Sequence, residues 1–220
     1  MAPHSVIPRI PQGIHLDTLY DASIWATIPS LELACFPWYR GGVRHATHAR
    51  LVHDGERIVA EFVCQDTHIS SRIIDLNGAV WTDSCVELFL RPDPDHTRQY
   101  FNIEINACGT LLMAWGTDRN RRVYIDFDDA KDIKIHHSVR GMLKNEAADD
   151  REWRIVAPIP LTVLRRLSGL PLGLASGTRW TGNLCRCGGV TNPQYACWSP
   201  IEHPVPDFHR PDSFKDLVFA

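Results

Sequence analysis

The sequence predicts an all-β protein: an antiparallel β-sandwich of jelly-roll or immunoglobulin-like type, with one or two short helices. Three observations indicate this class. Short stretches of strand-forming residues recur at regular spacing, turn residues separate them, and at most two segments suit a helix. Because composition does not break along the chain, we expect one domain at residues 44–220, with residues 1–43 as an N-terminal arm packed on it.

The stretch from Trp81 to Trp115 has the clearest pattern and contains three predicted strands and two turns. Apolar and polar residues alternate in its first two strands, and successive strand residues point to opposite faces of a sheet. The apolar side consists of Val86, Leu88, Leu90, Phe101, Ile103 and Ile105, and the polar side includes Glu87, Tyr100, Asn102, Glu104 and Asn106.

The remaining elements follow along the chain. The dipeptide Asp54-Gly55 favours a hairpin, and Pro160 begins a short helix because proline suits the first helical turn. Strands are predicted at residues 45–52, 57–64, 133–139, 152–159, 177–187 and 214–219, the helix at 160–167 and an extended segment at 197–200.

Composition argues against several classes of partner. The formal net charge of −3 over 220 residues gives no electrostatic reason to bind nucleic acid. No apolar run reaches the length of a membrane span, and the first residues have no apolar run typical of a signal peptide, so we expect a cytoplasmic protein. The seven cysteines are odd in number and are expected to stay reduced. Cys185 and Cys187 lack the spacing of a zinc knuckle, and no cofactor is predicted.

The polar face of the central strands indicates a ligand site. It carries carboxylates, amides and a tyrosine, and Trp81 directly precedes its first strand. An aromatic ring covers the C–H face of a polar ring ligand while such polar groups bind its hydroxyls. An ordinary polar sheet face, with Trp81 at the edge of the core, would give the same pattern.

The same residues resemble a known family. Residues 81–89, WTDSCVELF, are similar to the W-x-x-[DS]-x-V-E-x-F motif of family 9 carbohydrate-binding modules, and residues 100–109, YFNIEINACG, resemble the strand and turn that follow it. The segments EWRIVAPIPL and PDFHRPDSFKDLVF match in order and spacing, so the resemblance covers residues 40–220. It implies a stand-alone bacterial protein with a DOMON-type β-sandwich. The characterised members are attached to secreted xylanases and bind sugars between two tryptophans.

Site residues are implied by this resemblance. Trp81 would form one wall of the sugar slot, and Glu87 would accept hydrogen bonds from sugar hydroxyls. Glu104 and Asn106 would lie on the same side. The implied ligand is a mono- or oligosaccharide derived from xylan or cellulose, with a glycoside hydrolase as partner in polysaccharide breakdown. No catalytic residue is implied.

The chain departs from the family pattern near its C-terminus. His209 stands where the second tryptophan wall is expected, and Trp198 is an alternative for that wall. Arg210 would serve either as a sugar ligand or as a salt bridge that fixes the tail.

Three other hypotheses stay open. A DOMON-type domain would hold haem with Met113 and a histidine such as His209. A glycoside hydrolase would use Glu87 and Glu104 as paired carboxylates. Family members carry structural calcium, and the acidic turns at residues 92–95 and 126–129 would hold it here.

Overall fold

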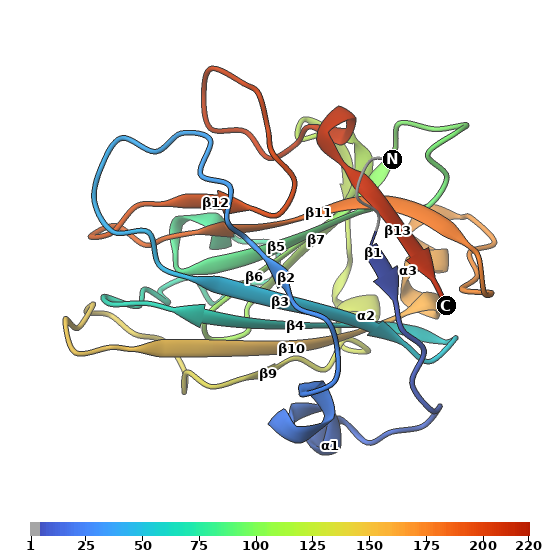
Figure 1. The fold of residues 1–220 in the computed structure, drawn as a ribbon, viewed down its shortest axis with the longest axis horizontal. Helices are drawn as coiled ribbons and strands as arrows, with labels where there is room; N and C mark the ends of the chain where they lie inside the picture. Colours follow the sequence, from blue (N-terminus) through green and yellow to red (C-terminus); the bar gives the residue numbers. More distant parts are fainter. Residues whose placement is uncertain (1–4) are drawn as a thin grey trace.

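Two β-sheets pack face to face in the computed structural model (Figure 1), which describes residues 5–220. Residues 1–4, the first part of the predicted N-terminal arm, lie outside the described residues. The larger sheet has the spatial order β1 (Ser5–Ile7), β13 (Lys215–Phe219), β11 (Arg179–Cys187), β5 (Cys85–Arg91), β6 (Tyr100–Asn106), β7 (Leu111–Asp118) and β8 (Arg121–Tyr124), with β12 (Tyr195–Cys197) paired to β11. The smaller sheet has the order β2 (Leu31–Glu32), β3 (Thr47–His53), β4 (Arg57–Gln65), β10 (Glu152–Pro160) and β9 (His136–His137).

This arrangement confirms the predicted all-β sandwich. The strand pairs are antiparallel, apart from the parallel pair of β1 with β13. The helices are short, namely α1 (Leu16–Tyr20), α2 (Phe127–Ala130) and α3 (Leu161–Ser168), and α3 is the helix that Pro160 predicts. No helix of the described chain is long and apolar enough to cross a membrane.

The structure differs from the prediction in two places. No strand was predicted within residues 116–131, but β8 returns there against β7. The turn between them is tight because the Asp118 carboxylate accepts hydrogen bonds from the backbone N–H groups of Asn120 and Arg121, at 2.9 and 3.0 Å. The strand expected at 133–139 is reduced to the two residues of β9.

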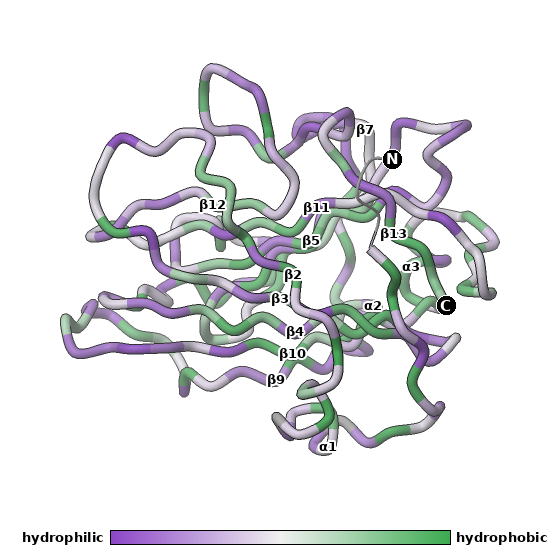
Figure 2. The backbone as a smooth tube through the Cα atoms, in the orientation of Figure 1, coloured by the Kyte–Doolittle hydropathy of each residue, from purple (hydrophilic) through white to green (hydrophobic). Residues whose placement is uncertain are grey.

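The alternation in the central strands confirms which side chains face the core. The apolar set from β5 and β6 lies between the sheets, where it packs against apolar residues of β3, β4 and β10. Figure 2 shows hydrophobic and hydrophilic colours in turn along the strands of both sheets. The opposite set, which includes Glu87 and Glu104, therefore lies on the outer face of the larger sheet.

The N-terminal segment joins both sheets. Its β1 pairs with β13 of the larger sheet, and its β2 pairs with β3 of the smaller one. Between them, α1 and a following 3₁₀ turn cover the outer face of the smaller sheet (Figure 1), where Leu19 and Trp25 pack on Val59 and Val156.

Candidate functional site

A cavity of about 420 Å³ opens on the outer face of the larger sheet. Its floor comes from the strands, its aromatic walls come from loops and β12, and its polar rim comes from the β7–β8 hairpin and the segment before β13. The lining residues are Glu87, Glu104 and Cys187 from the floor, Trp81, Tyr195, Phe208 and His209 from the walls, and Arg119, Asn120, Arg122, Pro206 and Asp207 from the rim.

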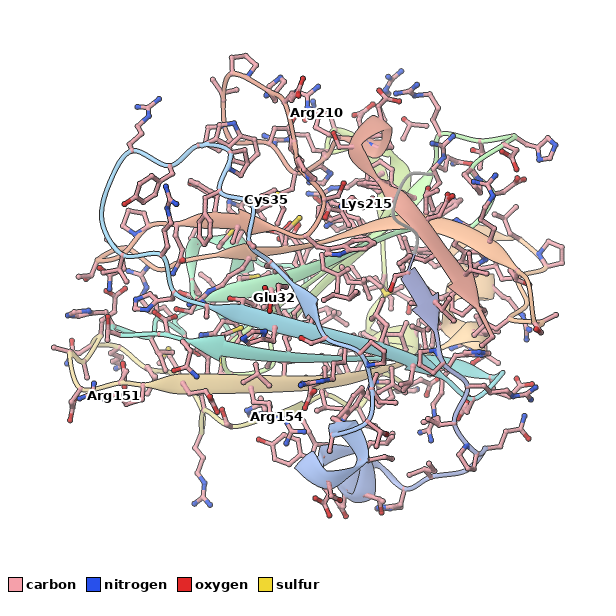
Figure 3. All side chains as sticks on the ribbon, in the orientation of Figure 1. Glu32, Cys35, Arg151, Arg154, Arg210 and Lys215 are labelled. Carbon is pink, nitrogen blue, oxygen red and sulfur yellow. The ribbon has the colours of Figure 1, made fainter. Side chains whose placement is uncertain are left out.

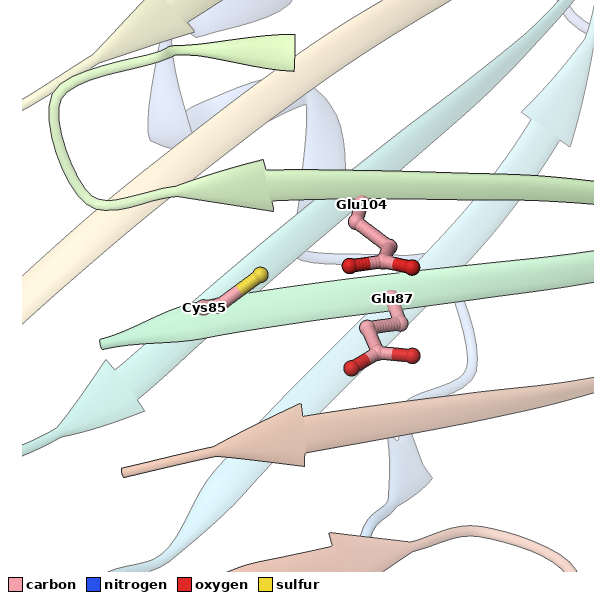
Figure 4. A group of neighbouring side chains, drawn as sticks. All are labelled: Cys85, Glu87 and Glu104. Carbon is pink, nitrogen blue, oxygen red and sulfur yellow. The ribbon is translucent and has the colours of Figure 1, made fainter. Parts of the chain in front are cut away.

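Two carboxyl groups lie side by side on the cavity floor (Figure 4). Glu87 of β5 and Glu104 of β6 are directly opposite in the strand register, and their side chains are only 4% and 2% exposed. The thiol of Cys187 on β11 donates a hydrogen bond to Glu87 Oε1 at 3.2 Å. The nearest cation to Glu104 is Arg122, whose Nη1 lies 3.9 Å from Oε1.

Burial decides the protonation of this pair. It raises the pKa of Glu87 well above its usual value, and the neighbouring Glu104 adds to the rise. Burial also raises the pKa of Glu104 to about 7, although Arg122 acts in the opposite direction. Near neutral pH the floor therefore offers both protonated and ionised carboxyl groups, which donate and accept hydrogen bonds respectively.

Trp81 is held at the cavity because Val80 before it and Asp83 after it in the sequence are buried and anchored. It sits in a 3₁₀ turn, Val80–Thr82, that leads into β5. Val80 is fully buried, and the buried Asp83 carboxylate accepts hydrogen bonds from the backbone N–H groups of Arg72 and Ile73 at 2.8 and 2.9 Å. Trp81 itself stays 45% exposed. An anchored turn thus presents an indole to the cavity.

The second large aromatic wall is Tyr195, which the sequence analysis did not identify. In the register of β12 with β11, Tyr195 lies opposite Cys187, on the face that carries Glu87, and Tyr195 is 38% exposed. Trp198 is three residues further on and therefore has the opposite orientation. It packs against the core between the sheets and does not line the cavity.

His209 does line the cavity, and aromatic neighbours hold it in place. Its Nδ1 shares a hydrogen bond with the Tyr100 hydroxyl at 2.8 Å, and its ring packs edge-on against Phe89. Burial, assisted by the positive charges of Arg122 and Arg119, lowers the pKa of His209 to about 3. The imidazole is therefore neutral at physiological pH and contributes an apolar edge and a polar nitrogen.

Two further residues named from the sequence lie elsewhere. Asn106 is on the predicted face, but its Nδ2 donates to Asp83 Oδ2 at 3.0 Å and to the Ile73 carbonyl at 2.8 Å, so it fixes the preceding loop instead of lining the cavity. Arg210 forms a salt bridge of 2.6 Å with Asp207 and lines a neighbouring hollow on the surface. Figure 3 shows Arg210 in the loops at the top of the view.

The polar rim was missed because it depends on the β7–β8 hairpin. Arg122 is almost buried and donates to Asn102 of β6, two strands away. Arg119 forms an ion pair of 2.5 Å with Asp207, which connects the hairpin to the segment before β13. The run Arg119-Asn120-Arg121-Arg122 was the sequence feature that could have predicted this rim. Without knowledge of the β7–β8 pairing, such a charged run is typical of a solvated loop.

The haem and calcium hypotheses do not fit these positions. Met113 is fully buried in the core between the sheets, on the face of β7 away from the cavity. The acidic turns do not gather their carboxylates around a common point, because Asp95 pairs with Arg179 and Asp129 pairs with Arg166. Within residues 5–220, potential metal donors of three side chains converge only at Cys85, Glu87 and Glu104.

Comparison with known proteins places the chain in a family. The sequence profile of carbohydrate-binding family 9 matches residues 18–219. None of the curated proteins compared with the chain matches it. A candidate carbohydrate-binding protein from Bacteroides uniformis has a similar solved structure, with a TM-score of 0.89, 24% identity and 99% of each chain covered.

Two further solved structures show the same fold. A family 9 carbohydrate-binding module from Caldicellulosiruptor kristjanssonii in complex with cellotriose has a TM-score of 0.60 and 11% identity, with 99% of this chain and 93% of that chain covered. The same kind of module in complex with glucose has a TM-score of 0.58 and 12% identity, with coverages of 99% and 96%. Because the profile match spans nearly the whole sequence, the chain belongs to carbohydrate-binding family 9.

Proposed function

We propose that the cavity binds a sugar ring and that the protein is a non-catalytic carbohydrate-binding protein. One observation carries this proposal: a half-exposed Trp81 opens onto the same cavity as two buried carboxyl groups, Glu87 and Glu104. The indole offers an apolar plate to the C–H face of a sugar. The carboxyl groups offer hydrogen bonds to its hydroxyls, which both donate and accept.

The cavity residues supply a polar environment that matches a hydroxylated ligand. Arg119 and Asn120 provide donors at the rim, and Asp207 provides acceptors. A volume of about 420 Å³ is within the range of small-molecule sites. The family membership and the cellotriose and glucose complexes of related modules support a ligand built from glucose units, as in cellulose. Xylose units, as in xylan, are the second ligand class that we propose. Such a ligand would connect the protein with polysaccharide breakdown, alongside a glycoside hydrolase that acts on the same polymer.

The position of the carboxyl pair favours binding over hydrolysis. Glycoside hydrolysis requires two carboxyl groups that flank the scissile bond. Glu87 and Glu104 are direct cross-strand neighbours on one sheet face, so both approach a ligand from the same side. An assay for reducing sugar released from xylan would detect hydrolysis, and we expect none.

The test is a titration of the purified protein with glucose, xylose, cellobiose and xylobiose, followed by calorimetry and tryptophan fluorescence. We expect Trp81→Ala to weaken binding at least about tenfold, equivalent to about 1.4 kcal/mol. The matched control is Phe127→Ala, because Phe127 is 75% exposed and does not line the cavity. Equal affinity of the wild type and Trp81→Ala, or no response to any of the four sugars, would refute the proposal.

A further inference from the structure

Next to the cavity floor, the buried Cys85 forms a group of potential metal donors with the two floor carboxyl groups, Glu87 and Glu104. Cys85 and Glu87 are two residues apart on β5 and face the same side, and Glu104 is opposite Glu87 on β6. One potential metal-ligand atom from each of these side chains lies within 4.8 Å of the other two. Figure 4 shows the sulfur of Cys85 and both carboxyl groups gathered on one side of the strands.

The hydrogen bonding of these donors is incomplete. Glu104 is 2% exposed, and its Oε2 atom is buried without any hydrogen-bond partner. Its other oxygen lies 3.9 Å from Arg122, which is beyond a hydrogen bond. The Cys85 thiol donates a hydrogen bond to the Val86 carbonyl oxygen at 3.5 Å, so the unpartnered atom of this group is the Glu104 oxygen. Buried polar atoms normally have a partner, so an unpartnered carboxylate oxygen beside other potential metal ligands points to a site for a positively charged ligand.

We propose that Cys85, Glu87 and Glu104 bind a divalent transition-metal ion, with Zn²⁺ as the best match. This site goes beyond the proposed sugar binding: it shares Glu87 and Glu104 with the proposed sugar site but does not require a bound sugar. A thiolate with two carboxylates suits Zn²⁺, which accepts sulfur and oxygen ligands, whereas Ca²⁺ and Mg²⁺ select oxygen alone. Binding releases the thiol proton of Cys85 and the carboxyl proton of Glu87 to solvent. The divalent ion with one thiolate and two carboxylates keeps one net negative charge, which Arg122 faces at 3.9 Å from Glu104 Oε1.

The surroundings give such an ion an entry path and an open position. Glu87 and Glu104 both line the cavity, so an ion reaches them from solvent. Cys187 orients Glu87 from the neighbouring strand through its hydrogen bond. Three protein ligands leave a fourth tetrahedral position, which a water molecule or a hydroxyl of a bound ligand would fill on the cavity side.

The test uses the full chain, freed of metal with a chelator and then titrated with Zn²⁺ by calorimetry. We expect one Zn²⁺ per chain, and affinity at least about a hundredfold weaker in Cys85→Ser and in Glu104→Gln, since loss of even an outer partner costs up to about that factor. Replacement by Co²⁺ should give a sulfur-to-metal charge-transfer absorption that disappears in Cys85→Ser. Cys108→Ser is the matched control, because Cys108 is a free, half-buried thiol outside the donor set.

Several outcomes would overturn the inference. They are no stoichiometric Zn²⁺ binding, unchanged affinity in both Cys85→Ser and Glu104→Gln, or equal loss in Cys108→Ser. Should Cys85→Ser fail to fold, as judged by circular dichroism, Glu104→Gln decides alone. A parallel titration of the metal-free protein with the same four sugars separates the two proposals. Sugar binding without Zn²⁺ binding rejects only the metal site, and Zn²⁺ binding without binding of any of the four sugars rejects only the proposed function.

Discussion

Glu61 lies on the outer face of the smaller sheet, and Glu87 and Glu104 lie on the outer face of the larger one, all three buried. Glu61 is held by two cations: Arg50 Nη1 is 2.8 Å from Oε2, and Arg154 Nη2 is 2.5 Å from Oε1. Glu87 and Glu104 instead have each other as neighbours and no cation within hydrogen-bond distance among the residues described.

This contrast separates a structural carboxylate from the carboxyl pair that we propose binds a ligand. The other buried carboxylates resemble Glu61, because Asp54, Asp66 and Asp83 each accept hydrogen bonds from nearby donors. An ionised group without such partners costs free energy in the folded state. Glu87 and Glu104 are therefore maintained at a cost to stability, as expected of groups that act on a ligand.

The largest change in the free energy of unfolding is expected at Glu61, whose buried charge is fully paired. Glu61→Gln leaves Arg50 and Arg154 without their carboxylate, and the guanidinium of Arg154 lies against α1 (Figure 3), where it also donates to the Tyr20 carbonyl. Breaking a buried pair by removing one partner should lower the free energy of unfolding by about 3 kcal/mol. Urea unfolding at pH 7 measures this, and a loss below about 1 kcal/mol would mean that water replaces the carboxylate.

The same substitution at Glu104 should have the opposite sign. The folded-state pKa of Glu104 is about 7, against an unfolded value of 4.5, so its protonated form is favoured in the folded state. Its stabilising contribution is complete below pH 4.5 and is lost as the pH rises through 7. We expect Glu104→Gln to raise the free energy of unfolding by about 2 kcal/mol at pH 8 and to leave it unchanged at pH 4.

Urea unfolding at both pH values, with a chelator present, checks this. The contrast between the two sheets would be lost if Glu104→Gln destabilised the protein at pH 8 as Glu61→Gln does. A stabilisation of equal size at pH 4 would instead show that the effect comes from packing and not from charge.

The sequence predicted the shared sheet face of Glu87 and Glu104, but it predicted neither the face of Glu61 nor the partners of any of the three carboxyl groups. Alternation within β5 placed Glu87 correctly because it depends on local chain geometry alone. Tyr195 and Arg122 depend on the register of β12 with β11 and of β8 with β7, two hairpin pairings that the sequence analysis did not predict. The face of Asn106 was predicted correctly. However, Asn106 ends its strand, and its side chain donates a hydrogen bond to Asp83 in the preceding loop instead of lining the cavity.

A third, smaller effect concerns the neutral His209 at the cavity wall. Its folded-state pKa is about 3, against an ordinary value of 6.5. Between these two pH values, His209 binds a proton in the unfolded chain but not in the folded one. The contribution of His209 to the free energy of unfolding is constant above pH 6.5 and is lost as the pH falls from 6.5 towards 3. Between pH 7 and pH 5, the wild type should lose about 1 kcal/mol more stability than His209→Gln. Parallel losses in the two proteins would show that His209 titrates normally.

The smallest expected change in the free energy of unfolding is at an exposed ion pair. It tests whether pairing or burial accounts for the stabilisation by Glu61. Lys131 forms an ion pair of 2.9 Å with Asp128 on α2, a distance similar to that of Arg50 and Glu61, but its side chains are 55% and 85% exposed. Water already solvates both charges, so Lys131→Ala should change the free energy of unfolding by only about 0.3 kcal/mol, and less in high salt. The measurement is urea unfolding at low and high ionic strength beside Glu61→Gln. If Lys131→Ala lowered the free energy of unfolding nearly as much as Glu61→Gln, ion-pair geometry would stabilise this fold independently of burial. Glu61 would then differ from Glu87 and Glu104 only in the distance to the nearest cation.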